Sequence, residues 1–269
     1  MSDSARKTRP FSQVDHIEAD RKFHTDSSRP DPQCTILANS DKIRRNGLLS
    51  VLPPVEYSRL LPALKPVNLK RGTVLYCAND VLTDCYFPLS SVISLFSTTE
   101  DDKTVEVMMV GSEGMIGVPV FLLRNIMPYE AIVQNDSQAL RIKSNILVRH
   151  FNESAAFRSL LLHYIDLQLC EFSQSIICNS FHTVKQRFCS WLLTVRDKMQ
   201  SRTFFSTQEF ISQILGTPRT NIAMTIKTLE DLRIIIYKRG SITIINRNEL
   251  RKNACECYEF KKRTSRSSL

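Results

Sequence analysis

The spacing of hydrophobic positions changes twice along the chain. Between about residues 67 and 143, short apolar runs alternate with polar turns, which is typical of β-strands. Before and after that region, hydrophobic residues recur every three or four positions, which is typical of helices. We therefore predict an α+β chain with an N-terminal β-roll. The strands are expected at 74–76, 85–87, 92–96, 105–110, 131–133 and 139–142.

A long helix is predicted from about residue 155 to 177, directly after the roll. Its hydrophobic positions alternate between spacings of three and four, which is the heptad pattern of a coiled-coil seam. Such a seam requires a partner helix, and an identical chain is the simplest partner, so we predict a parallel homodimer. The alternative is that the helix packs against the roll. The seam residues are Leu162, Ile165, Leu169, Phe172 and Ile176.

Residues 206–231 form the pattern of two helices joined by a tight turn. Gly216 is expected to end the first helix, because glycine tolerates the left-handed conformation found at many helix ends. Thr217 is expected to cap the second helix, and Pro218 to occupy its first turn. The buried faces are predicted at Phe210, Ile211 and Ile214 in the first helix, and at Ile222, Ile226 and Leu229 in the second.

This helix-turn-helix is followed by two predicted strands, 232–237 and 242–245, with a basic turn between them, so the pattern indicates a winged helix. In such motifs the second helix enters the major groove. Arg219 suits guanine and Asn221 suits adenine. The alternative is a helical hairpin in an ordinary core. The candidate DNA-binding residues are Thr217, Arg219, Thr220, Asn221, Lys227, Lys238 and Arg239.

Five segments are therefore expected along the chain. A polar, proline-broken leader at 1–40 is predicted to be disordered. The segments that follow are 41–154 (helices and roll), 155–179 (dimerisation helix and hinge), 180–260 (winged helix-turn-helix domain) and 261–269 (basic tail).

Two local patterns refine the C-terminal half. A hinge is expected at 178–182, followed by a capping box formed by Thr183 and Gln186 that starts the next helix. A last short helix is expected at 249–260. The helix after the hinge should bury Phe188, Trp191, Leu192 and Val195.

The net charge of +9 lies in the half that contains the helix-turn-helix. From residue 180 onward there are 17 lysines and arginines against 7 acidic residues, whereas residues 1–179 hold 19 against 20. A neutral half joined to a basic half is typical of a sensor joined to a nucleic-acid binder. No apolar run is long enough for a membrane span and no signal-peptide core follows the start, so a cytoplasmic protein is expected.

The eight cysteines are scattered, except for Cys255 and Cys257. One close pair without a second pair predicts no metal site, and Cys34 alone in the leader cannot supply the thiolates of an iron–sulfur cluster. A thiol redox sensor that uses Cys255 and Cys257, next to the cations of Arg251 and Lys252, is an alternative function.

Nothing in the sequence predicts catalysis or a bound cofactor. None of the five histidines stands in a motif with a nucleophile or a metal-ligand partner. There is also no P-loop and no Gly-x-Gly-x-x-Gly motif. We therefore expect that the protein is not an enzyme.

The order of parts over residues 45–260 resembles the Crp/Fnr family of bacterial transcription regulators. The most specific segments are 216–222, the Leu229-Glu230 pair and 86–88. The resemblance implies a homodimer, a palindromic DNA site and contact with RNA polymerase. The segments 179–182 and 254–258 resemble a subgroup without a well-defined ligand.

The resemblance transfers some roles and not others. Arg219 matches the family's principal base-reading arginine, whereas Thr220 and Met224 replace charged residues that contact DNA in many members. In the roll, Val118 stands where cyclic-nucleotide binders have a glutamate, and Tyr129 and Glu130 stand where they hold the phosphate. We therefore expect that cyclic AMP is not bound in the usual way; the alternative is another small ligand in the roll. The weak candidate pocket is Gly114, Gly117, Val118, Tyr129 and Glu130.

Overall fold

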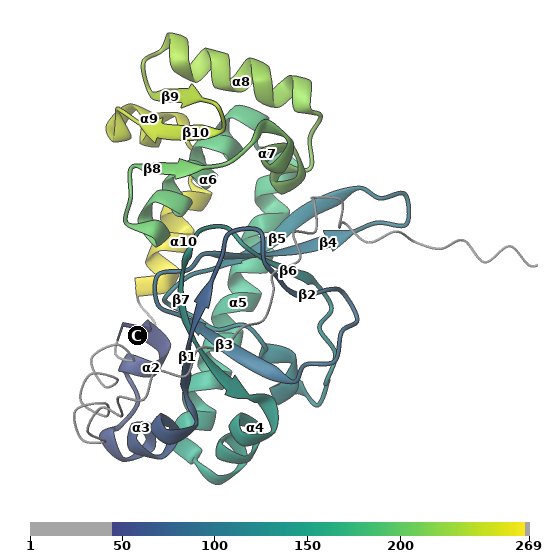
Figure 1. Ribbon diagram of the computed structural model, residues 1–269. Coiled ribbons are helices and arrows are strands. Elements are labelled where there is room, and N and C mark those ends of the chain that lie inside the picture. The colour runs from purple at the N-terminus through teal and green to yellow at the C-terminus, as the bar shows by residue number, and fades with distance from the viewer. Residues whose placement is uncertain (1–44, 267–269) are drawn as a thin grey trace, which may run out of the picture.

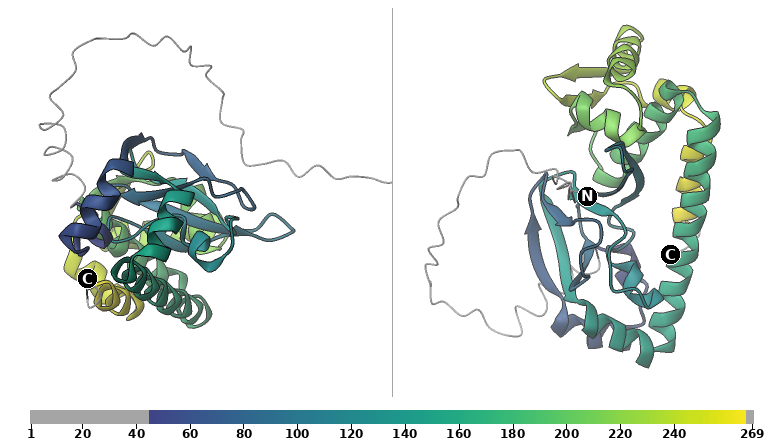
Figure 2. Two further views of the ribbon diagram at one scale, coloured as in Figure 1. Left: turned by 90° about the horizontal axis from the view of Figure 1, so that it is seen from below. Right: turned by 90° about the vertical axis from the view of Figure 1, so that its right-hand side faces the viewer.

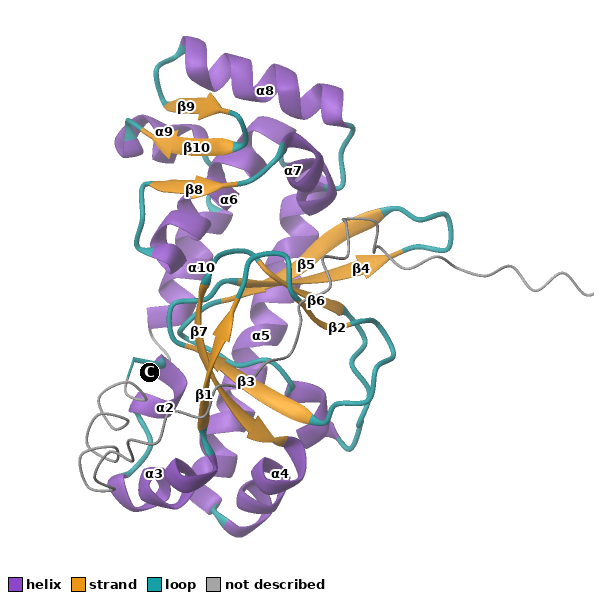
Figure 3. Cartoon of the chain, in the orientation of Figure 1, coloured by secondary structure: helices purple, strands orange, loops and turns teal. Residues whose placement is uncertain are grey.

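A computed structural model describes residues 45–266 of the protein. The predicted leader at 1–40 and the last three residues of the predicted tail lie outside the described residues. Figure 1 shows a roll of strands in the middle, short helices at one end and a second, smaller domain at the other. In Figure 3 the strands gather in the roll and in the small sheet of that second domain, and helices surround both.

The roll is made of two antiparallel sheets, ordered β1-β7-β3 and β2-β6-β4-β5. All six predicted runs are strands, within two or three residues at their ends. The structure adds β1, which the sequence pattern missed because most of its side chains are exposed and its inward-facing apolar residues are only Val67 and Leu69. The strands are β1 Lys65–Leu69, β2 Val74–Tyr76, β3 Asp84–Pro88, β4 Ile93–Thr98, β5 Thr104–Val110, β6 Glu130–Val133 and β7 Ser137–Lys143.

Short helices flank the roll. The predicted interruption at Pro53 and Pro54 is confirmed, since one helix ends just before this pair and the next begins at Pro54. A helix directly after the roll, α4, was not predicted as a separate element. The helical segments around the roll are α2 Gly47–Ser50, α3 Pro54–Leu60, η1 Leu61–Ala63, η2 Val118–Leu122 and α4 Ser144–Glu153.

The long helix α5, Ala155–Phe181, connects the roll to the second domain (Figure 2). It is four residues longer than predicted, so most of the expected hinge is helical and the chain turns only at His182. The residues of the predicted seam fall into two groups, one packed against the roll and one exposed. Ile165 and Phe172 are partly buried against the roll. Three residues exactly one heptad apart remain exposed: Leu162 (50%), Leu169 (59%) and Ile176 (68%).

The second domain begins with α6, Val184–Met199, and the predicted capping box of Thr183 and Gln186 is confirmed. Its four expected core residues are buried. The wing sheet has the order β8-β10-β9, in which β8 was not predicted. The remaining elements are β8 Thr203–Phe205, α7 Gln208–Leu215, α8 Arg219–Asp231, β9 Ile235–Lys238, β10 Ser241–Ile244, α9 Arg247–Asn253 and α10 Cys257–Arg266.

The end of the chain differs from the prediction of one helix at 249–260. Two helices are present, and the chain is non-helical at Cys255 between them. The second helix, α10, continues through the residues expected to be a basic tail and lies alongside α5. Among the described residues, no helix has both the length and the apolar character needed to span a membrane.

The two domains share a hydrophobic contact. Val92, Phe96, Met109 and Ile132 of the roll belong to the same buried cluster as the core of the second domain. The guanidinium of Arg71 also lies 3.9 Å from the centre of the Phe205 ring, across the same boundary. The second domain is therefore docked on the roll as well as tethered by α5.

Candidate nucleic-acid interface

The helix-turn-helix consists of α7 and α8. Helix α7 is capped by Thr207, whose hydroxyl accepts a hydrogen bond from the Phe210 N–H at 3.1 Å. It ends at Gly216, which has φ +54°, as the sequence predicted. A Cβ on Gly216 would lie 3.3 Å from Val105, so the turn also lies close to β5 of the roll.

The start of α8 differs from the prediction. Pro218, not Thr217, occupies the N-cap position, and it offers no side-chain cap. The Thr217 hydroxyl instead accepts a hydrogen bond from the Asn221 side-chain amide at 3.3 Å. Threonine is a residue type typical of an N-cap, which is why the sequence alone favours Thr217. The extended backbone of Pro218 moves the helix start one residue further along.

Helix α8 buries one face and exposes the other. Ile222, Ile226 and Leu229 are almost completely buried, which confirms the predicted stripe. Thr220, Met224 and Lys227 follow each other at spacings of four and three residues and are exposed.

Arg219 is exposed in the first turn of α8, and Asn221 is half-buried. Figure 1 shows α8 as the outermost element of the second domain, on the side away from the roll. The structure therefore leaves this helix accessible to a long, grooved partner.

The wing is a two-residue hairpin between β9 and β10. Arg239 (φ +51°) and Gly240 (φ +80°) form its turn, and Lys238 pairs with Ser241. Lys238 and Arg239 are both exposed at this tip. Gly240 is required here because a Cβ would lie 2.7 Å from the Phe205 ring.

The residues of the weak ligand pocket are held by packing contacts inside the roll. Gly114 allows Tyr164 of α5 to approach, and the Tyr164 hydroxyl accepts a hydrogen bond from the Met115 N–H at 3.0 Å. Gly117, with φ +112°, lies against Cys85, and Val118 begins η2. The close backbone approach that the glycines permit is thus used by the protein's own side chains.

The other two pocket candidates lie at the start of β6. The ring of Tyr129 lies against Phe172 of α5, with centroids 6.1 Å apart. Glu130 is the first residue of β6 and is half-buried, and burial raises the pKa of its carboxyl. A partly buried carboxylate is unfavourable for an anionic ligand at this position.

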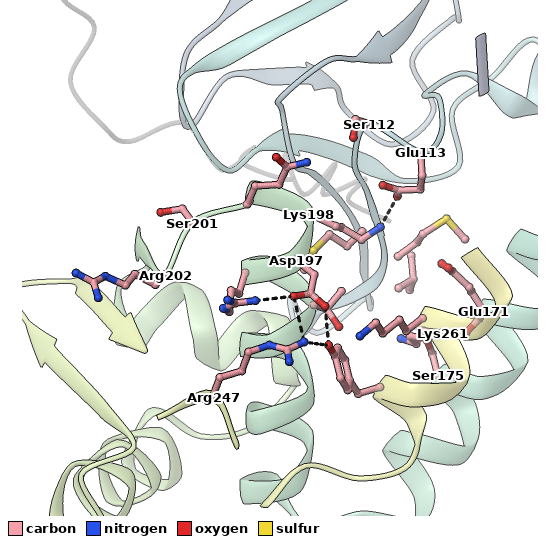
Figure 4. Close-up of a pocket in the computed structure, with 18 residues that line it drawn as sticks. Ser112, Glu113, Glu171, Ser175, Asp197, Lys198, Ser201, Arg202, Arg247 and Lys261 are labelled. Atoms are coloured by element: carbon pink, nitrogen blue, oxygen red, sulfur yellow. Dashed lines mark hydrogen bonds and ion pairs between the residues drawn. The ribbon is translucent and has the colours of Figure 1, made fainter. Parts of the chain in front are cut away.

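A cavity of about 600 Å³ lies between the roll, α5, α6 and α10 (Figure 4). Lysines and arginines outnumber acidic residues in its lining, and several are paired. Asp197 accepts a hydrogen bond from the Tyr258 hydroxyl at 2.6 Å and forms ion pairs with Arg196 (3.0 Å) and Arg247 (3.7 Å). The sequence did not reveal this cavity, because its lining residues are spread from Val107 to Lys262.

On one wall of this cavity, Lys198 of α6 forms an ion pair with Glu113, which lies in the turn between β5 and η2. Burial raises the pKa of Glu113, but the charge and hydrogen bond of Lys198 outweigh it, so the net pKa lies below its ordinary value. In the fold, Glu113 links the roll to the second domain.

The cysteine pair Cys255 and Cys257 is buried and is not isolated. The Sγ atoms of Cys178 and Cys255 are 3.6 Å apart, and the Sγ of Cys257 lies 3.5 Å from Nδ1 of His182. The prediction of no metal site relied on the scatter of cysteines along the sequence. That reasoning fails because the fold brings residues near 180 to residues near 256.

Two family models match the chain. One describes a cyclic nucleotide-binding domain, over residues 66–154, and the other a Crp-like helix-turn-helix domain, over residues 186–253. Together they span more than half of the 269 residues. No curated protein sequence matches the chain.

Solved structures share the fold at low sequence identity. A protein described as a transcriptional regulator of the Crp/Fnr family from Eubacterium rectale is 16% identical, with a TM-score of 0.63, covering 78% of this chain and 98% of that one. CLP from Xanthomonas campestris, a c-di-GMP-responsive global regulator, is 13% identical (TM-score 0.60, 71% and 99% coverage). FixK2 from Bradyrhizobium japonicum is 11% identical (TM-score 0.60, 71% and 98% coverage).

Proposed function

Because this chain belongs to the Crp/Fnr family of DNA-binding transcription regulators, we propose that it acts as a homodimer that reads a palindromic DNA site. The observation that carries this proposal is the exposed face of α8, presented on the side of the domain away from the roll. Each protomer places one α8 in the major groove, and the two-fold symmetry of the dimer matches that of the site.

Individual side chains divide into base readers and phosphate contacts. Arg219, in the first turn of α8, reads guanine through two parallel hydrogen bonds. Asn221 reads adenine, or holds the turn through its bond to Thr217. Lys227, Lys238 and Arg239 contact phosphates, which fixes the register of the protein on the duplex without reading sequence.

The dimer is supported by the exposed face of α5. Leu162, Leu169 and Ile176 form a straight apolar line over two heptads of a 27-residue helix. Pairing with the same line of a second chain removes these side chains from water and contributes about 25 cal/mol per Å² of apolar area buried. It also sets the distance between the two α8 helices, and so the spacing of the half-sites.

The roll does not bind cyclic AMP in the usual way in this proposal. Val118 has no group to hold a ribose hydroxyl, and Glu130 repels a phosphate. The protein is not an enzyme, binds no organic cofactor, and acts on DNA in the cytoplasm, where it contacts RNA polymerase as the family does.

A small-ligand-gated regulator is a second candidate, favoured by the cavity of Figure 4. Its lining includes Glu113 from the roll, Lys198 from α6 and Lys261 from α10, so a ligand there touches both domains and α10. The excess of cations favours an anionic ligand. Calorimetric titration of the protein with cyclic AMP and with cyclic di-GMP, with and without Lys198→Ala, tests this candidate.

The test of the main proposal is selection of binding sites from random DNA. The wild type is expected to enrich a palindrome whose half-sites lie about one helical turn apart or a multiple of it. Arg219→Ala should lose or broaden that motif. The control is Arg59→Ala, an exposed arginine on α3 at the opposite end of the molecule, which should enrich the wild-type motif. No enriched sequence from the wild type, or the same motif from Arg219→Ala, contradicts the proposal.

A further inference from the structure

Four potential metal ligands meet where the long helix ends. Cys178 lies in the last turn of α5, and His182 is the residue that ends it. Cys255 lies in the link between α9 and α10, and Cys257 is the first residue of α10. Their ligand atoms all lie within 4.8 Å of one another, and both C-terminal cysteines are buried.

Two of the separations between these atoms match those of ligands on a single tetrahedral ion. Zn–S bonds of about 2.3 Å and Zn–N bonds of about 2.0–2.1 Å place neighbouring tetrahedral ligands about 3.5–3.8 Å apart. The Sγ atoms of Cys178 and Cys255 are 3.6 Å apart. The Sγ of Cys257 is 3.5 Å from Nδ1 of His182. Both distances fall in the range for two ligands of one ion.

Neighbouring groups support the four ligands. Nε2 of His182, on the side of the ring away from Cys257, lies 3.1 Å from the Glu256 carboxylate, and such a partner orients a metal-binding imidazole. The Gln174 amide donates to the Sγ of Cys257 at 3.0 Å, and the hydroxyl of Ser190 lies 3.1 Å from the Sγ of Cys255. Each of these contacts stabilises a ligand in the orientation that binding requires.

We propose that Cys178, His182, Cys255 and Cys257 form a closed mononuclear zinc site. Binding displaces the thiol protons to solvent, and three thiolates with one Zn²⁺ leave a net charge of −1. Arg187 on α6 is close enough for its charge to interact with Cys178 and Cys255, so it offsets part of that charge.

Two other groupings of the same residues fit less well. A [4Fe–4S] cluster places each cysteine on a different iron atom, and a [2Fe–2S] cluster divides its four ligands between two irons, so either cluster separates some ligand pairs further than one shared ion does. A disulfide requires sulfurs about 2.05 Å apart. At 3.6 Å the sulfurs of Cys178 and Cys255 are instead at the spacing of two ligands.

The position of the site gives it a consequence for the fold. It ties the end of α5 and the start of α6 to the link before α10, and α10 in turn lies along α5. The ion therefore fixes the junction between the helix that carries the exposed heptad line and the domain that carries α8. This consequence rests on the proposed DNA-binding function, whereas the zinc site itself does not.

The test is metal analysis of the reduced, full-length protein. We expect one zinc per chain by mass spectrometry of the metal content. Replacement by Co²⁺ should give the intense visible bands of a tetrahedral site together with thiolate-to-cobalt absorption in the near ultraviolet. Cys178→Ser and Cys257→Ser should each lose stoichiometric binding, and Glu256→Gln should weaken it about tenfold.

Matched controls are Cys170→Ser, on the same helix but outside the cluster, and Cys189→Ser, buried in the neighbouring core; both should keep the metal. The wild-type cobalt spectrum does not depend on whether any variant folds. A folded wild type that gives no tetrahedral cobalt spectrum, or one isolated with a Cys178–Cys255 disulfide, overturns the proposal.

The effect of the ion on the junction between α5 and the second domain is tested separately, by measuring DNA binding. Removal of zinc by a chelator should weaken binding to the selected palindrome, and added zinc should restore it. If the affinity for DNA is unchanged after verified zinc loss, the ion does not fix the junction, although the zinc site itself is not contradicted. Failure of the DNA-binding proposal is recognised independently, because Arg219→Ala then leaves sequence preference intact while zinc remains bound.

Discussion

The ring of Phe210 in the helix-turn-helix lies edge-on against Phe96 of the roll, with centroids 5.6 Å apart. Phe96 is 2% exposed, and it belongs to the core of the second domain although it stands on β4. The domain that carries α8 is thus held by a roll side chain as well as by α5.

Phe96→Ala should therefore weaken the docking of the two domains. The truncation removes a buried ring, which costs about 3–5 kcal/mol when a core side chain is lost. We expect a lower melting temperature and a transition that separates into two steps in calorimetry. The control is Phe181→Ala, whose side chain is 80% exposed and should change stability by less than about 0.5 kcal/mol. A single unshifted transition in Phe96→Ala contradicts this coupling.

Leu169→Glu should convert the dimer to a monomer without unfolding it. The side chain is exposed in the isolated chain, so the carboxylate remains solvated there, but in a paired helix it is desolvated next to its symmetry mate. Light scattering coupled to size-exclusion chromatography measures the mass, and circular dichroism checks folding. Val81→Glu, an equally exposed apolar position in the roll, should remain dimeric. A monomeric wild type, or a dimeric Leu169→Glu, refutes the assignment.

Lys227→Ala and Lys238→Ala should weaken DNA binding without altering the selected sequence. A lysine that contacts one phosphate releases counterions, so each replacement should reduce the slope of log affinity against log salt by about 1. Fluorescence anisotropy across a range of salt concentrations measures the slope. If either variant changes the preferred sequence instead, that lysine reads bases.

Glu106 should make the stability of the protein depend on pH. Glu106 lies on β5. Burial raises the pKa of its carboxyl to about 7, although hydrogen bonding from Ser94 and the charges of Lys261 and Lys198 oppose the shift. The unfolded carboxyl ionises near 4.5, whereas the folded one keeps its proton to higher pH. Stability from this group is therefore full below pH 4.5 and is lost as the pH rises to about 7.

Glu106→Gln removes this loss, because glutamine stays neutral. The variant should gain stability relative to the wild type by about 3 kcal/mol at pH 8, and by less than about 1 kcal/mol at pH 5. Denaturant titration at the two pH values gives the comparison, and Glu100→Gln at the exposed hairpin tip controls for the change of charge. If the free energy of unfolding differs between Glu106→Gln and the wild type by the same amount at both pH values, Glu106 does not have this role.

Local patterns were sufficient for the elements that carry the candidate DNA interface. The stripe of Ile222, Ile226 and Leu229, the left-handed Gly216 and the wing hairpin follow from short-range spacing and turn chemistry, and the structure confirms them, although the first strand of the wing begins at Ile235 and not at residue 232. The Leu229-Glu230 pair gained a physical explanation only from the fold. Leu229 fills the core, while the Glu230 carboxylate accepts a hydrogen bond from the Tyr237 N–H at 2.8 Å and fixes α8 against β9.

Features that depend on long-range contacts were missed. The end of α5 was placed too early because 178–181 look polar and hinge-like, although Cys178 is held in the helix beside Cys255. The strand β8 has only three residues and is recognisable through its pairing with β10. The cysteine–histidine cluster joins residues about 75 positions apart, and no sequence spacing can reveal such a group.

The measurement that tests the central claim most directly is a double-mutant cycle of DNA-binding affinities, in which Arg219 and single guanines of the site are replaced separately and together. The wild type and Arg219→Ala are titrated against the selected palindrome and against versions in which one symmetric pair of guanines is replaced. We predict a coupling of about 1–3 kcal/mol per half-site at one guanine and none at the others. If the effects of Arg219→Ala and of every guanine replacement simply add, Arg219 reads no base, and α8 is not the recognition helix.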